Sequence, residues 1–296
     1  MSVLETAACC EAPRPANTSP VVIAVVNPKG GCGKTTTAVS LAYAFSEQGH
    51  RTLLVDLDKQ RSTTRFFGLE VGAAESIGAA LTRGTFLDLA GEQPDDARRV
   101  DSILVTGLAE QNGLDLLPSQ KTAMARAEAD LNNDTVNGNF RLREVLAAGA
   151  GGYDIVVIDT PGNLNAMNVN ALVAAGHALV VTQPAPGDID EAIGLLDLIG
   201  GVQARFNPDL TVLGVALTNV PNPATNISDV MLGVVQRDIV EGLGVPIMRD
   251  QIVKDTKIVE AHGMRRPVGA AFPLSKGALR YKWMAEDIAS RVGLAL

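Results

Sequence analysis

Unbroken runs of hydrophobic residues alternate with segments of helical periodicity along most of the chain. The clearest run is Val21–Val26, and weaker or shorter runs lie at 114–117 and 245–248. The other runs occupy residues 52–57, 154–159, 178–182 and 211–218. Strands that are buried on both faces of a parallel sheet have this continuous apolar character. We therefore expect these segments to be strands of one mostly parallel sheet.

Between these runs, apolar residues recur every three or four positions, which predicts helices. The predicted helices span about 34–48, 119–131, 138–148, 165–175, 188–206, 225–241 and 275–292. Alternating strands and helices indicate a doubly wound α/β fold with helices on both sides of the sheet. The pattern predicts one domain over residues 21–296, after a flexible, proline-containing arm at 1–20. Residues 68–112 are expected to form short helices and loops.

Composition and charge exclude several classes of protein. The chain is 46% hydrophobic and carries a net charge of −8, which excludes wholesale disorder and a globally basic nucleic-acid binder. Residues 249–296 nevertheless hold nine basic and five acidic residues, a local net charge of +4. The three cysteines have no metal-ligand spacing, and we see neither a secretory signal nor an apolar run of membrane-spanning length. We therefore expect a cytoplasmic protein without a membrane anchor.

The loop after the first strand carries the most specific motif. Residues 27–36 read Asn-Pro-Lys-Gly-Gly-Cys-Gly-Lys-Thr-Thr and fit the P-loop pattern except at Pro28, where the first glycine is expected. A glycine-rich turn presents backbone N–H groups to a phosphate, and Lys34 and Thr35 suit the β,γ-phosphates and Mg²⁺. The predicted nucleotide contacts are Lys29, Gly30, Gly31, Cys32, Gly33, Lys34, Thr35 and Thr36.

Acidic residues follow two other predicted strands. Asp56 and Asp58 end the second strand, and they point the same way while the chain stays extended. Asp159 ends the apolar run Ile155–Ile158 in the manner of a Walker B motif, where a carboxylate holds magnesium-bound water. Because ligands of open α/β sheets lie at the carboxyl ends of the strands, these carboxylates are candidates for the same site.

The run from Lys29 to Thr35 resembles the deviant Walker A loop of the ParA/MinD class of ATPases. In that class the first lysine, here Lys29, reaches the nucleotide of a dimer partner. The resemblance assigns Asp58 to placing the attacking water and Asp56 to supporting the magnesium shell, with Lys29 and Lys34 as the catalytic cations. The family usually continues Pro-Gln-Gly-Asn, whereas this chain continues Lys-Gln-Arg-Ser at 59–62.

Other stretches extend the resemblance over about 21–292, including Gly113–Ser119, Val181–Pro184 and Glu260–Pro267. With about twenty residues before the first strand, the closer match is to chromosomal and short plasmid members that lack an amino-terminal helix-turn-helix domain. The resemblance implies ATP and Mg²⁺ as cofactors and an ATP-bound homodimer on nucleoid DNA. It also implies a ParB-like or cargo adaptor protein that stimulates slow hydrolysis.

Basic residues near the carboxyl end are candidates for sequence-independent DNA binding, because phosphate contacts need only positive charge. Lys254 and Lys257 occupy positions where the resemblance places arginines, and three-residue spacing would put them on one helix face. Arg265, Arg266 and Lys276 complete the predicted DNA-binding set. Asn219 is a candidate for the adenine edge, with loop capping as the alternative.

Two other functions remain open at this stage. A MinD-like membrane-cycling ATPase would use the last helix as an anchor, but Glu286 and Asp287 dilute its charge and favour docking on the domain. A metabolic P-loop synthetase would transfer a phosphoryl group to a small carboxylate, and the double-lysine loop disfavours it. Trp283 is expected in the core.

Overall fold

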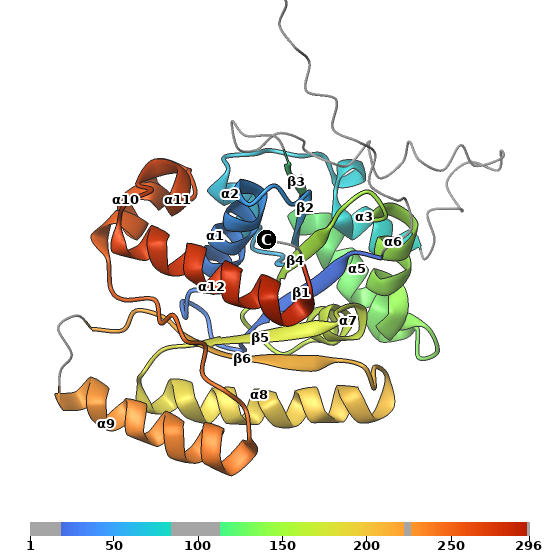
Figure 1. Ribbon diagram of the computed structural model, residues 1–296. Coiled ribbons are helices and arrows are strands. Elements are labelled where there is room, and N and C mark those ends of the chain that lie inside the picture. Colours follow the sequence, from blue (N-terminus) through green and yellow to red (C-terminus); the bar gives the residue numbers. More distant parts are fainter. Residues whose placement is uncertain (1–18, 84–112, 222–225, 295–296) are drawn as a thin grey trace, which may run out of the picture.

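A six-stranded parallel sheet forms the centre of the computed structural model, which describes residues 19–83, 113–221 and 226–294. The strands lie in the order β3-β2-β4-β1-β5-β6 (Figure 1). Their bounds are β1 Val21–Val26, β2 Thr52–Asp56, β3 Leu114–Leu117, β4 Ile155–Asp159, β5 His177–Thr182 and β6 Thr211–Leu217. The prediction of a parallel α/β sheet is therefore confirmed.

Helices cover both faces of this sheet (Figure 1). The longer ones are α1 Lys34–Glu47, α5 Lys121–Asn133, α6 Arg141–Gly149, α7 Ala166–Ala174, α8 Pro186–Arg205, α9 Asn226–Val235, α10 Thr256–Gly263 and α12 Lys276–Val292. The shorter ones are α2 Ser62–Phe66, α3 Ile77–Arg83 and α11 Val268–Ala271. Short 3₁₀ turns η1 and η2 span Ala73–Glu75 and Gly138–Phe140, and the π-helical segment η3 spans Gln236–Glu241.

The sheet has a separate hydrophobic core on each face, because successive side chains of a strand point to opposite faces. In β1, Ile23 and Val25 face one side and pack with α1 and α12, while Ala24 and Val26 face the other side and pack with α3 and α5 to α9. Side chains of a strand alternate between the faces of a sheet, so a run that is apolar at every position supplies both cores. This double burial explains why β1 and its neighbours have no polar face.

Several segments differ from the sequence-based prediction. The apolar run at 245–248 makes only an isolated bridge between Ile247 and Val215, so it does not continue the sheet as a regular strand. The predicted helix at 225–241 changes to π geometry after Val235. Helices α2, α10 and α11 were not predicted, because they span only four to eight residues and show too few turns for periodicity. The expected arm lies almost wholly outside the described residues, as does 84–112.

The last helix, α12, packs on α1, as the expectation that it docks on the domain requires. Met284 and Ile288 are fully buried, and the Tyr281 hydroxyl lies 3.2 Å from Thr37 Oγ1 of α1. The prediction that Trp283 belongs to the core is wrong: its side chain is 42% exposed and lies under the Arg280 guanidinium. None of the helices in the described ranges combines the length and apolarity of a membrane span.

We predict that Ile288→Ala destabilises the protein by about 2–5 kcal/mol, the range for truncating a fully buried aliphatic side chain. Trp283→Ala, on the same helix but outside the core, should cost less than Ile288→Ala. Urea denaturation followed by circular dichroism measures both values. Equal losses for the two variants would contradict the packing of α12 described above.

Candidate functional site

The loop between β1 and α1 curls with its carbonyl groups turned toward the protein. Lys34 Nζ donates to Lys29 O at 2.7 Å, Gln183 Nε2 donates to Gly31 O at 3.0 Å, and Thr218 Oγ1 donates to Cys32 O at 2.6 Å. With these carbonyls engaged, the amide groups of the curled loop are available to an anion, as in a phosphate-binding nest.

Gly33 ends this loop in the left-handed region, with φ at +98°, and α1 begins at the next residue. A Cβ at Gly33 would lie 3.3 Å from Thr218 Oγ1, so the close approach of the loop to β6 also requires glycine. Lys34, in the first position of α1, is buried with its ammonium turned back to the loop. Backbone amides, a helix start and a buried lysine thus converge at one point, which suits a phosphate.

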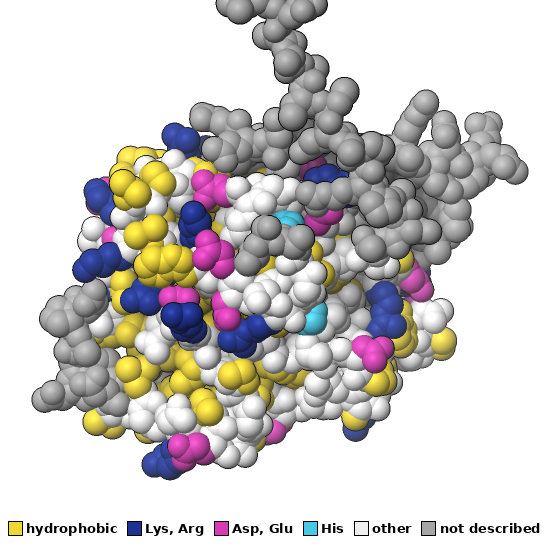
Figure 2. Space-filling view, viewed as in Figure 1, with side chains coloured by type: hydrophobic (Ala, Val, Ile, Leu, Met, Phe, Trp, Pro, Cys, Tyr) yellow, Lys and Arg dark blue, Asp and Glu magenta, His cyan; other side chains and the backbone are white. Residues whose placement is uncertain are grey.

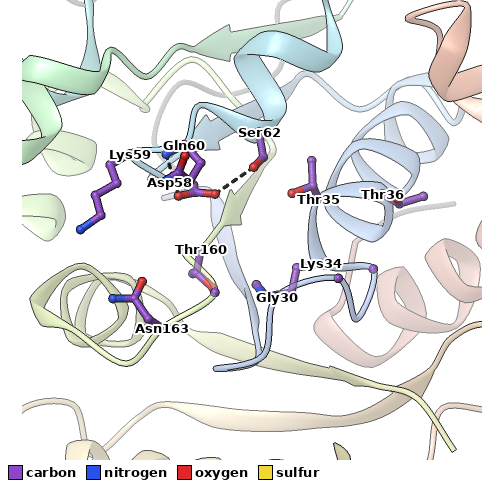
Figure 3. A pocket seen from close by; sticks show the side chains of 13 residues that line it. Gly30, Lys34, Thr35, Thr36, Asp58, Lys59, Gln60, Ser62, Thr160 and Asn163 are labelled. Carbon is purple, nitrogen blue, oxygen red and sulfur yellow. Dashed lines mark hydrogen bonds between the residues drawn. The ribbon is translucent and has the colours of Figure 1, made fainter.

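A cavity of about 480 Å³ opens over this loop. Its walls come from the segments that follow β1, β2 and β4, which the parallel sheet places along one edge (Figure 3). The lining residues are Gly30, Gly31, Gly33, Lys34, Thr35, Thr36, Asp58, Lys59, Gln60, Ser62, Thr160, Gly162 and Asn163. The structure therefore brings together most of the predicted phosphate contacts, together with Asp58.

Asp159, at the end of β4, lies behind this cavity and is fully buried. Its Oδ2 accepts hydrogen bonds from Thr35 Oγ1 and Thr63 Oγ1, both at 2.8 Å. Its Oδ1 is buried and has no hydrogen-bond partner among the described residues. A buried carboxylate oxygen without a donor is costly, so this arrangement suits a carboxylate that completes its shell with a cation or its bound water.

Asp56 and Asp58 have different environments. Asp56 is the last residue of β2, and Asp58 lies in the loop that follows it, so the condition of a regular strand through both residues is not met. Asp56 is fully buried, and its Oδ2 accepts from the backbone N–H and the hydroxyl of Thr64. Asp58 lines the cavity and accepts from Gln60 N at 2.9 Å and Ser62 Oγ at 2.8 Å. Asp58 therefore faces the ligand space, whereas Asp56 belongs to the interior behind it.

Burial sets the electrostatics of the two inner carboxylates. Desolvation, and then the neighbouring Asp159 on the adjacent strand, raise the pKa of Asp56 to about 8. Desolvation raises the pKa of Asp159 to about 6, although hydrogen bonds from Thr63 and Thr35 oppose the increase. Two buried acids side by side do not both ionise readily without a nearby cation. The inner half of the site is thus electrostatically suited to a divalent cation.

Lys29 lies at the rim of the loop with its ammonium paired to Asp188. The Lys29 side chain is 42% exposed, while that of Asp188, in the first turn of α8, is only 5% exposed. The two lysines of the loop therefore have different partners: the Lys34 ammonium bonds to the loop itself, through Lys29 O, and the Lys29 ammonium bonds to Asp188 of α8. Cys32 is buried beneath the loop, which agrees with a space-filling role.

Asn219 follows β6 in the left-handed region, with φ at +53°, and its side chain is exposed. Its Nδ2 lies 3.5 Å from Gln183 Oε1, and Gln183 in turn holds the loop through Gly31 O. Asn219 is thus connected to the phosphate loop through one side chain. Contact with an adenine stays a prediction.

The predicted DNA-binding residues gather around α10 and the start of α12. Lys254 is exposed, and so are Arg265, Arg266 and Lys276, whereas Lys257 pairs with Glu260 at 2.6 Å. The expectation that Lys254 and Lys257 share a helix face is wrong, because α10 begins at Thr256, after its N-cap residue Asp255. Asp255 accepts from both Lys257 N and Gly277 N, which draws the start of α12 to α10. The start of α10, which carries Lys257, and the start of α12, which carries Lys276, are therefore held together by the Asp255 side chain and not by spacing along one helix.

The fold and this site define a P-loop ATPase with a deviant, double-lysine loop. A family model described as an AAA domain matches residues 21–212. The chain is 32% identical over 273 residues to the chromosome partitioning protein ParA of Caulobacter vibrioides, covering 91% of this chain and 94% of that protein. It is 31% identical to the chromosome-partitioning ATPase Soj of Thermus thermophilus, covering 91% and 96%. The chain therefore belongs to the ParA family of ATPases.

A solved structure from Mycobacterium smegmatis, described as cobyrinic acid a,c-diamide synthase with bound ADP and magnesium, is also similar. It is 30% identical with a TM-score of 0.71, and the match covers 93% of this chain and 96% of that one. ATP and Mg²⁺ are thus the cofactors of this ATPase, and the residues present fit them. Lys34 and the glycine loop suit the phosphates, and Thr35 with the free Oδ1 of Asp159 suits a hydrated Mg²⁺.

Sequence reasoning missed several residues of the site. Thr63 and Thr64 hold the two buried carboxylates, Thr160 and Asn163 line the cavity, and Asp188 pairs with Lys29. The Ser-Thr-Thr run after the acidic segment was an available signal, because hydroxyl residues are typical of helix starts. Asp188 had no local signal, since its contact spans 159 residues of sequence.

We predict that Lys34→Ala weakens ATP binding by at least about a hundredfold. The lost ammonium makes charge-assisted contacts to phosphate, each worth about 1.5–3 kcal/mol. Titration with a fluorescent ATP analogue measures the dissociation constant, and the exposed Lys121→Ala serves as the matched control. If the Lys34 variant bound the nucleotide as tightly as the control, the phosphate site would have to lie elsewhere.

Proposed function

We propose that this protein is a partition or cargo-positioning ATPase. Two chains enclose two ATP–Mg²⁺ units, and the dimer binds double-stranded DNA without sequence preference. The ATP-bound dimer is associated with the nucleoid through this DNA. A ParB-like or cargo adaptor protein stimulates hydrolysis, and the chain is then released from the DNA. The observation that carries this proposal is Lys29: a second lysine at the rim of the nucleotide loop, half exposed and directed away from its own loop.

Hydrolysis proceeds by in-line attack of water on the γ-phosphorus, and the bond to the β,γ-bridging oxygen breaks. Asp58 orients that water, because its carboxylate lines the cavity and is itself fixed by Gln60 N and Ser62 Oγ. Lys34 neutralises charge that develops on the phosphates. Magnesium, when bound at Thr35 and near Asp159 with Asp56 behind it, supplies further charge neutralisation.

The Lys29–Asp188 ion pair gives the cycle its off state. To contact the nucleotide of a partner chain, the Lys29 ammonium exchanges Asp188 for a triphosphate, which carries more negative charge. ADP, which lacks the γ-phosphate, offers less compensation for leaving a buried carboxylate unpaired. The proposal therefore makes dimerisation depend on ATP through this exchange.

The surface over α10, α11 and α12 supplies the positive charge for DNA. Figure 2 shows Lys and Arg side chains gathered over this part of the molecule, with acidic and apolar side chains between them. Each protomer contributes Lys254, Lys257, Arg265, Arg266 and Lys276. A dimer doubles the number of phosphate contacts, and binding energy from linked contacts adds, so affinity rises steeply on dimerisation.

The similarity to the Mycobacterium smegmatis protein keeps a metabolic synthetase as a second candidate function. That alternative requires a small carboxylate acceptor for turnover, whereas the proposed ATPase requires only water and is stimulated by a macromolecular partner. Phosphate release by the purified protein without any acceptor separates the two. ATP-dependent binding to anionic vesicles in place of DNA would instead favour a membrane-cycling ATPase.

Asp58→Ala should preserve ATP binding and abolish turnover, because the variant keeps the phosphate loop but loses the group that orients water. It should accumulate as an ATP-bound dimer. Phosphate release and light scattering are measured on the same samples, with the exposed Asp209→Ala as the control. Turnover at the control's rate would remove Asp58 from the mechanism.

Lys29→Ala should leave nucleotide binding by the monomer largely intact but lose ATP-dependent dimerisation and, with it, DNA retention. Lys254→Ala combined with Lys257→Ala should give the opposite pattern, with normal dimerisation and weak DNA retention. DNA retention is measured with ATP, ADP or no nucleotide over a salt series, since phosphate contacts release counterions and weaken steeply with salt.

Equal DNA retention with ADP and ATP would contradict the nucleotide switch. Retention by the double lysine variant would move the DNA surface toward Arg265, Arg266 and Lys276. Asp188→Asn tests the ion pair separately: with the competing carboxylate neutralised, ATP-dependent dimerisation should occur at lower ATP concentration than in the parent.

A further inference from the structure

Three consecutive hydroxyl side chains at the start of α2 hold the three carboxylates of the site, one each. Ser62 Oγ donates to Asp58 Oδ2 at 2.8 Å, Thr63 Oγ1 donates to Asp159 Oδ2 at 2.8 Å, and Thr64 Oγ1 donates to Asp56 Oδ2 at 2.7 Å. Figure 3 shows the first of these bonds at the cavity wall. Consecutive helical residues point about 100° apart, so one turn of helix reaches three directions.

This turn is fixed on both sides. Arg61, the residue before it, adopts a left-handed conformation at φ +61°, and its guanidinium donates to Leu69 O at 3.0 Å and to Glu70 at 2.9 Å. Thr64 Oγ1 also accepts from Ser119 N at 2.8 Å. Thr63 and Thr64 are fully buried. The Thr63 and Thr64 hydroxyls therefore have defined positions and no access to water that could replace their bonds, whereas Ser62 lies at the cavity wall.

We infer that Thr63 is a positioning residue for the magnesium-binding carboxylate Asp159, and that Ser62 has the corresponding role for Asp58. This inference rests on the proposed roles of Asp159 and Asp58. Thr63 and Thr35 share the same oxygen, Oδ2, while Oδ1 lies buried without a partner. A metal ion would take the Thr35 hydroxyl oxygen as a ligand from the cavity side, whereas the Thr63 hydroxyl is fully buried behind the cavity and would serve only to hold the Asp159 carboxylate against rotation, with Oδ1 left for a metal-bound water.

The adjacent hydroxyls have separable consequences. The Ser62 hydroxyl donates to Asp58, the carboxylate that faces the cavity, so its loss affects turnover and not metal affinity. Thr64 holds Asp56, which is buried behind the site and does not line the cavity. Its loss acts on folding stability, because Asp56 and Ser119 N both lose a buried partner. One turn of helix thus serves metal binding, turnover and stability through three neighbouring residues.

The test is a magnesium titration of fluorescent ATP-analogue binding for the full chain and for Thr63→Val, Thr63→Ala, Thr63→Ser, Ser62→Ala and Asp159→Asn. Nucleotide binding in EDTA is measured in parallel as a reference that needs no metal. Loss of a group that orients a metal ligand typically costs ten- to a hundredfold in metal affinity. Thr63→Val and Thr63→Ala should therefore raise the Mg²⁺ half-saturation by at least about tenfold, and Thr63→Ser should restore it.

Ser62→Ala should keep the parent's Mg²⁺ half-saturation and lose most single-turnover hydrolysis at saturating Mg²⁺. Parent-like Mg²⁺ dependence in both hydroxyl-free Thr63 variants would overturn the inference while leaving the proposed function intact. Loss of binding in EDTA to the same extent would show a structural role only, and would also overturn it. Parent-like Mg²⁺ dependence in Asp159→Asn would instead remove the assignment of the metal site itself.

Discussion

The carboxylate of Asp159 is the point on which the nucleotide site depends. One of its oxygens joins the end of β4 to Thr35 of the phosphate-loop helix and to Thr63 of α2, across 124 and 96 residues of sequence. Burial makes this acid reluctant to ionise, and removing it would leave the buried Thr63 hydroxyl without its acceptor, at a cost of about 1–3 kcal/mol, while the Thr35 hydroxyl would lose its fixed position at the cavity. The loop, the Walker B strand and α2 are thus held in one arrangement by a single acid whose free oxygen is suited to a cation's shell.

The parallel sheet makes this convergence possible. β1, β2 and β4 are neighbours in the sheet and all end at the same edge, so the loop, Asp58 and Asp159 meet although they are distant in sequence. The same α2 that carries Thr63 also contacts the basic surface: the Phe66 ring lies 5.0 Å from the His262 ring at the end of α10. The nucleotide site and the proposed DNA surface are therefore joined through one short helix.

The pattern of apolar residues within each segment and the local motifs were enough to predict the sheet, the longer helices and the phosphate loop. Runs such as Val21–Val26 are apolar because both faces are buried, and this signal is local. Features that depend on tertiary contact were not predicted. Trp283 is apolar yet lies outside the stripe that α12 buries, and the Lys29–Asp188 pair joins residues that no local pattern connects. The family's glycine position is occupied by Arg61, which takes the left-handed conformation and gains hydrogen bonds to Leu69 and Glu70.

We propose that magnesium, bound among these carboxylates, and the γ-phosphate, bound at the phosphate loop, together convert one chain into a dimer. Sedimentation velocity of the unmodified protein tests it directly in three conditions: a slowly hydrolysed ATP analogue with Mg²⁺, ADP with Mg²⁺, and the ATP analogue with EDTA. We expect twice the monomer mass in the first condition and the monomer mass in the other two. The same mass in all three conditions would contradict it.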